Sequence, residues 1–121
     1  MKIDKFLQGQ INTYCESVSK DCKPVAMFPI QDRYVKEVVE IINKYYDKSL
    51  LFHMDFLYKD WTTVWIYKKP FMKEIINNLP EQPKTIFDHW VLGKVFGYSD
   101  EAIEEYLSSG KGSSVTFSAR R

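Results

Sequence analysis

The segment 50–69, LLFHMDFLYKDWTTVWIYKK, constrains the fold most, because six aromatic side chains fall within sixteen of its residues. It reads as two strands joined at Lys59–Asp60, with Tyr58 opposite Trp61. Strand side chains alternate between two faces, so this register predicts one aromatic face made of Phe52, Met54, Phe56, Tyr58, Trp61, Thr63, Trp65 and Tyr67. The opposite face would carry Leu51, His53, Asp55, Leu57, Thr62, Val64, Ile66 and Lys68. Both faces are largely apolar, so the sheet must be covered twice or must offer one face to a partner.

Periodic patterns on either side of this segment predict five helices and one further strand. Apolar side chains recur at helical spacing over residues 3–20 and 35–46, and VAMFPI at 25–30 has the composition of a short buried strand. Asp32 is placed to cap the second of these helices. The hairpin is followed by three predicted helices, over residues 70–79, 84–96 and 100–107.

Capping residues support the last two helices. Thr85 and Asp88 have the spacing of a capping box, and Ser99 is suited to start the final helix. Gly97 suits the left-handed position that ends the preceding helix.

The element order is therefore α-β-α-β-β-α-α-α, which predicts an α+β fold with a small mixed three-stranded sheet. The strand–helix–strand unit at 25–57 should make a right-handed parallel crossover, to which the hairpin adds an antiparallel strand. We expect the first two helices on one face of the sheet, and the last three as a C-terminal helical layer on the other face or at one end. Residues 1–108 are expected to form a single domain, followed by a flexible polar tail over 109–121.

The composition is that of a globular protein. With 121 residues, 45% of them hydrophobic, the chain is long enough to build a core without a disulfide or a metal. Cys15 and Cys22 are expected to be free thiols. Because we see neither a signal-peptide core nor an apolar run long enough for a membrane span, we expect a cytoplasmic protein that does not bind membranes. The preference for lysine over arginine suggests an AT-rich coding genome, such as that of a low-GC bacterium, a phage or a mobile element.

Three interpretations of the aromatic face stay open. In the first, the C-terminal helices fold back and bury it. In the second, a patch at the hairpin tip made of Tyr58, Trp61 and Trp65 binds a protein partner, because Tyr and Trp are enriched at such contacts. In the third, the face stacks single-stranded nucleic acid, using Phe56 together with Lys59, Lys68, Lys69 and Lys73. The net charge of +1 argues against binding a polyanion over the whole surface.

The segment 92–107 has the turn pattern of a helix-turn-helix, but its second helix is acidic. Four carboxylates on that helix oppose the electrostatic attraction that DNA binding requires. We expect either a structural helical hairpin or an acidic face that docks on a basic partner through Glu101, Glu104 and Glu105.

Catalytic and metal-binding patterns are weak. His53 and Asp55 share a strand face and could start an acid–base or metal site, but the other histidine is His89, far along the chain. We find no nucleophile motif and no glycine-rich phosphate loop, so no catalytic residue, metal or cofactor is predicted. The sequence favours a small non-enzymatic regulator, adaptor or inhibitor that acts by protein–protein binding. A nucleic-acid-binding protein is the alternative, and a small enzyme or metal protein around His53 and Asp55 is a third hypothesis.

Overall fold

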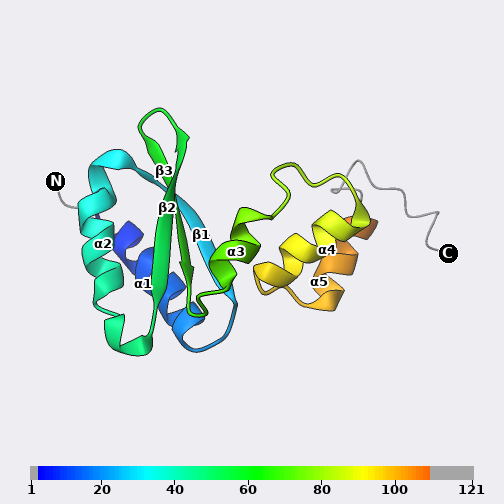
Figure 1. Ribbon diagram of the computed structural model, residues 1–121, viewed down its shortest axis with the longest axis horizontal. Helices are drawn as coiled ribbons and strands as arrows, with labels where there is room; N and C mark the ends of the chain where they lie inside the picture. The colour runs from blue at the N-terminus through cyan, green and yellow to red at the C-terminus, as the bar shows by residue number, and fades with distance from the viewer. Residues whose placement is uncertain (1–2, 110–121) are drawn as a thin grey trace. The chain divides into compact units, whose positions relative to one another are not determined.

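The computed structural model describes residues 3–109 and confirms the predicted α+β class and order of elements. Within these residues the helices are α1 (Lys5–Ser19), α2 (Val35–Asn43), α3 (Met72–Asn77), α4 (Ile86–Val95) and α5 (Asp100–Ser108). The strands are β1 (Val25–Gln31), β2 (Leu51–Tyr58) and β3 (Trp61–Tyr67) (Figure 1). Beyond Ser109, the predicted tail lies outside the described residues.

Side-chain caps fix where several helices begin. At α1, the carboxylate of Asp4 accepts a hydrogen bond of 2.8 Å from the N–H of Leu7. At α4, the predicted capping box between Thr85 and Asp88 is confirmed, with both reciprocal bonds present. At α5, the hydroxyl of Ser99 accepts from the N–H of Ala102, as predicted. These bonds satisfy backbone N–H groups that the first turn of a helix leaves without a partner.

The prediction that Asp32 caps α2 is wrong. A 3-10 turn at Asp32–Tyr34 comes first, and α2 begins at Val35 without a side-chain cap. The carboxylate of Asp32 instead accepts a hydrogen bond of 2.6 Å from the hydroxyl of Thr62 in β3. A tertiary partner has taken the place of the local capping bond, and it ties the end of β1 to the neighbouring strand.

The sheet is antiparallel throughout, so the predicted mixed sheet is wrong in this detail. The strand order is β1-β3-β2, and both β1 and β2 pair with β3 in antiparallel fashion. The two strands joined by α2 do run parallel to each other, but β3 lies between them. The central place suits β3, whose Val64 and Ile66 are fully buried, because a central strand is the best protected from water.

The β2–β3 register differs from the predicted one by a single residue. Tyr58 lies opposite Trp61 as expected, but the register shifts between Phe56 and Tyr58, so that Phe56 lies opposite Thr62 and Met54 opposite Val64. A shift of one residue moves every following side chain to the other face. The single aromatic face is therefore wrong. Phe52, Met54 and Phe56 share a face with Val64 and Ile66, whereas Trp61, Thr63, Trp65 and Tyr67 share the other face with Leu51, His53 and Asp55.

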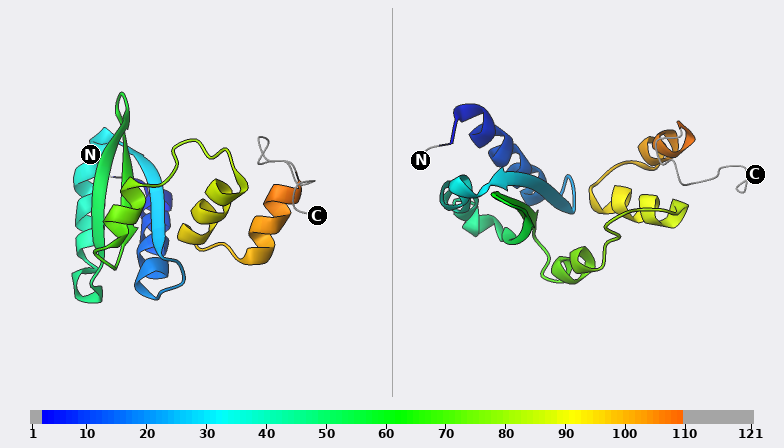
Figure 2. Two further views of the ribbon diagram at one scale, coloured as in Figure 1. Left: turned by 45° about the vertical axis from the view of Figure 1, so that its right-hand side comes forward. Right: turned by 90° about the horizontal axis from the view of Figure 1, so that it is seen from above.

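α1 and α2 cover the face that carries Val64 and Ile66, which confirms the predicted place of the first two helices (Figures 1 and 2). The core between the two layers consists of Ile11, Cys15, Val18, Ala26, Phe28, Ile30, Val38, Ile41, Ile42, Leu50, Val64 and Ile66. Phe52 and Met54 are partly buried and pack against this core. The register shift thus brings the first half of β2 onto the helices.

By its internal contacts the chain divides into two compact units, with the boundary between Met72 and Lys73 at the start of α3. The first unit holds the sheet with α1 and α2. The second unit holds α4 and α5, which pack against each other. The single domain predicted over residues 1–108 stays a prediction, because a division by contacts does not test whether the units fold independently.

The turn between α4 and α5 is built on Gly97, as predicted. Its φ of 84° lies in the left-handed region that favours glycine. The N–H of Gly97 donates to the carbonyl of Lys94 at 3.1 Å, and the N–H of Tyr98 donates to the carbonyl of Gly93 at 2.9 Å. This pair of bonds is a Schellman motif, which ends α4 and turns the chain back along it.

Candidate functional site

The first candidate surface is the outer face of the sheet, which α1 and α2 do not cover. Its side chains come from all three strands: Met27, Leu51, His53, Asp55, Trp61, Thr63, Trp65 and Tyr67. Trp61 and Trp65, two residues predicted to bind a partner, lie on this face together and are both partly buried. Met27 on β1 and Leu51 on β2 are exposed, so this face carries apolar side chains on both edge strands.

His53 lies at the centre of a polar cluster on this face. Its Nδ1 is 3.1 Å from the hydroxyl of Tyr67, and its Nε2 is 3.6 Å from the carboxylate of Asp55. Its ring stacks on Trp65, with centroids 6.1 Å apart and an interplanar angle of 19°. Burial, and then the Asp55 carboxylate, raise the pKa of Tyr67, so the phenol stays protonated at neutral pH. The predicted proximity of His53 and Asp55 is confirmed, and the cluster joins β2 to β3 across the outer face.

The aromatic platform predicted for unpaired bases is divided between the two faces. Phe56 is 82% exposed, but it lies on the other face from Trp61 and Trp65. Tyr58, at the hairpin tip, is 55% exposed, and its ring lies 6.2 Å from that of Trp61. Stacking successive bases requires rings on one continuous surface. The register therefore weakens the nucleic-acid alternative.

One of the lysines predicted to neutralise phosphates is engaged within the fold. The Nζ of Lys68 donates to the carbonyl of Ser19 and to the carboxylate of Asp21, each at 3.1 Å. Lys59 and Lys69 are exposed in the first unit. Lys73 belongs to the second unit. Lys68 thus has a structural role at the end of α1.

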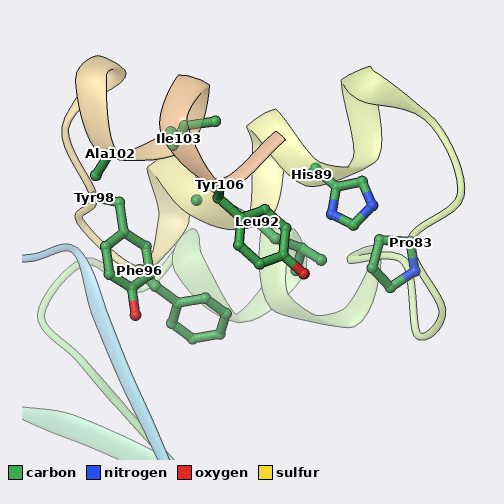
Figure 3. Close-up of a pocket in the computed structure, with 9 residues that line it drawn as sticks. Pro83, His89, Leu92, Phe96, Tyr98, Ala102, Ile103 and Tyr106 are labelled. Atoms are coloured by element: carbon green, nitrogen blue, oxygen red, sulfur yellow. The ribbon is translucent and has the colours of Figure 1, made fainter. Parts of the chain in front are cut away.

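The second candidate surface is a pocket within the second unit, between α4 and α5 (Figure 3). It has a volume of about 470 Å³ and is lined by Pro83, His89, Leu92, Gly93, Phe96, Tyr98, Ala102, Ile103 and Tyr106. Phe96 and Tyr98 lie toward one end of the pocket in Figure 3, and His89 and Pro83 toward the other. This size and this mostly apolar lining are typical of sites that receive a ligand or a partner side chain.

α4 is the unusual element of this surface. Its sequence, IFDHWVLGKV, places apolar side chains on every side of the helix, yet none of its residues is buried. A helix that is apolar all round is normally covered on all sides. Phe87 is 73% exposed, and Tyr98, just after the helix, is 62% exposed. The second unit therefore presents more apolar surface than its own two packed helices cover.

The second unit is acidic. Residues 73–109 contain seven Asp and Glu against three Lys, a net charge of −4 with histidine neutral. Lys94 is already engaged, since its Nζ contacts the carboxylate of Asp100 and lies 5.0 Å from the ring centroid of Trp90. The predicted partner residues Glu101, Glu104 and Glu105 are all exposed on α5. By helical geometry, Glu105 lies next to the pocket-lining Ala102, whereas Glu104 points to the other side of α5.

His89 brings one polar atom into the pocket wall. Its Nε2 is buried, and no described residue forms a hydrogen bond with it. The ring lies 5.7 Å from that of Tyr106. A buried nitrogen in this state favours a bound group that can exchange a hydrogen bond with it.

The described residues, 3–109, contain no group of three or more His, Cys, Asp or Glu side chains arranged to hold a metal ion. Over the same range, every helix is too short or too polar to cross a membrane. No protein-family model and no curated protein sequence matches the chain.

The sequence does not predict the pocket. Its pattern places Leu92, Phe96 and Tyr106 in a helical hairpin, which is either structural or carries an acidic docking face. The signal that would have pointed to the site is the all-round apolar character of residues 86–96, because two short helices cannot cover such a segment.

Proposed function

We propose that this protein is cytoplasmic and non-enzymatic, and that it acts as a regulator, adaptor or inhibitor. It would do so by binding another protein through the pocket between α4 and α5. The observation that carries the proposal is α4 itself, a helix with apolar side chains on every side and no buried residue. Leaving that much apolar area in water is unfavourable by roughly 25 cal/mol for each Å². A partner that covers it gains this free energy on binding.

The charge of the second unit defines the chemistry of the partner. An apolar pocket in a unit with a net charge of −4 favours a segment that carries a large apolar side chain flanked by Lys or Arg. The apolar side chain would enter the pocket, and a basic residue would lie against Glu105. Basic flanks speed association more than they strengthen the final complex.

A capture experiment with matched variants tests this proposal. Ala102 is exposed and lines the pocket, so Ala102→Trp fills it without disturbing a buried position. Ser108→Trp adds the same side chain on the opposite side of α5. From a lysate of the source cell, the wild-type protein and Ser108→Trp should retain the same protein, and Ala102→Trp should lose it.

Two further comparisons test whether the contact is electrostatic and whether the hairpin tip takes part in it. Glu105→Gln should weaken capture, and so should raising the salt concentration. Tyr58→Ala, at the hairpin tip, should leave capture unchanged. Loss with Tyr58→Ala and retention with Ala102→Trp would contradict the pocket and move the contact to the hairpin.

A further inference from the structure

β2 is the least protected strand of the sheet. It stands at one end of the order β1-β3-β2, so one of its edges has no neighbouring strand among the described residues. None of its residues is buried, in contrast to β1 and β3. β1, the other end strand, contains Pro29, which has no N–H to pair, while β2 contains neither proline nor lysine. Such an edge is a template for another strand.

We propose that β2 pairs with β2 of a second copy of this chain, antiparallel and about a two-fold axis at Met54. The two sheets then join into one continuous six-stranded sheet, with Met54 of one copy opposite Met54 of the other. In this register His53 lies opposite Asp55 of the second copy, and Phe52 lies opposite Phe56. The Met54 pair lies on the two-fold axis and forms once, whereas the His53–Asp55 and Phe52–Phe56 pairs each form twice.

The side chains select this register over its neighbours. This register sets an imidazole opposite a carboxylate, whereas the two neighbouring registers set like groups opposite each other. Moving the axis by one residue would place Asp55 opposite Asp55, or His53 opposite His53. Facing carboxylates destabilise a strand pair. An axis that passes between two residues is not possible. It would pair neighbouring residues, whose side chains point to opposite faces, whereas directly opposite residues of an antiparallel pair share a face.

The exposure of Phe56 supports the same arrangement. Its ring is 82% exposed on the face that α1 and α2 cover elsewhere, whereas Phe52 on the same face is partly buried against the core. Pairing brings the exposed ring of one copy beside the anchored ring of the other. Aromatic rings that face each other across two strands are a favourable pair.

The test measures both the oligomeric state and the register of the full chain. By sedimentation analysis, the wild-type protein should be a dimer at 100 µM, and Asp55→Lys should weaken dimerisation at least tenfold while the far-ultraviolet circular dichroism is unchanged. A wild-type protein that stays monomeric at 200 µM would overturn the proposal.

Cysteine cross-linking reads the register in a Cys22→Ser background, which removes the exposed native thiol. Under mild oxidation, Met54→Cys should form a disulfide-linked dimer. Phe56→Cys alone should not, because its two copies would lie four residues apart, roughly 13 Å along the strands. Mixing Phe56→Cys with Phe52→Cys should form the mixed dimer. Cross-linking of Phe56→Cys alone as fast as Met54→Cys would overturn this pairing. The pocket of the second unit plays no part in these outcomes, so they are independent of the proposed function.

Discussion

Gly93 in α4 lies so close to Ile103 in α5 that a Cβ atom on the glycine would stand 2.6 Å from Cγ1 and 2.7 Å from Cδ1 of the isoleucine. Real Cβ atoms do not approach other atoms this closely. Ile103 is buried, so its side chain has little room to move. The contact sets the separation of the two helices and, with it, the shape of the pocket that both residues line.

Gly93→Ala should therefore lower the free energy of unfolding. Overpacking costs about 1–3 kcal/mol, and the better helix propensity of alanine offsets up to about 1 kcal/mol of that. Gly9→Ala is the matched control, because nothing lies within 4 Å of a Cβ atom built on Gly9 in α1. That variant should stabilise the protein by about 0.5–1 kcal/mol. Urea denaturation measures both changes, and a stabilising Gly93→Ala would contradict the close contact.

Lys68 and Lys69 should differ although they are neighbours. Lys68 bonds the carbonyl of Ser19 and the carboxylate of Asp21 at the end of α1, whereas Lys69 is exposed. Lys68→Ala should cost about 1 kcal/mol of stability, the usual net worth of such bonds. Lys69→Ala should cost almost nothing. Thermal unfolding compares the two variants. Equal melting temperatures would show that the bonds of Lys68 do not stabilise the fold.

The two thiols should react at very different rates. Burial raises the pKa of the Cys15 thiol to about 12, and the Glu16 carboxylate adds to the rise, while Cys22 is exposed. Because the thiolate is the reactive form, a thiol reagent at pH 8 should label Cys22 alone in the native protein. Both cysteines should react in denaturant. Rapid labelling of a native Cys22→Ser variant would show that Cys15 is accessible.

Asp88 should make part of the stability depend on pH. The N–H groups of Lys84 and then Thr85 donate to its carboxylate and hold its pKa below the ordinary value of 3.8. Because the folded pKa is the lower one, the stabilisation is present above about pH 4 and disappears as the pH falls through the folded value. The stability difference between the wild type and Asp88→Asn should shrink on acidification. A difference that grows below pH 4 would contradict this sign.

Local signals predicted the elements well, and long-range contacts explain what they missed. Thr85, Gly97 and Ser99 act within a few residues of the turns that they define, so their roles could be read from the sequence. Asp32 could not, because its partner is Thr62 in another strand. The pairing of β2 with β3 also depends on a register shift beside Leu57. The hairpin turn contains neither glycine nor asparagine, so its sequence gives no sign of this shift.

The same limit applies to the candidate site. The acidic character of α5 was evident from Glu101, Glu104 and Glu105. The pocket beside it depends on how closely Gly93 meets Ile103, which is a property of the packed pair and of neither helix alone. His53 and Asp55 were paired correctly because residues two apart on a strand share a face.

Selection of random peptides on the full chain, followed by NMR of the methyl and indole N–H groups, is the most direct test of the pocket between α4 and α5. The selected peptides should carry a large apolar residue flanked by Lys or Arg. Their addition should shift the methyl resonances of Leu92 and Ile103 and leave those of Ile66, in the sheet core, unchanged. Peptides without basic residues, or shifts confined to the indoles of Trp61 and Trp65, would contradict a partner site at this pocket.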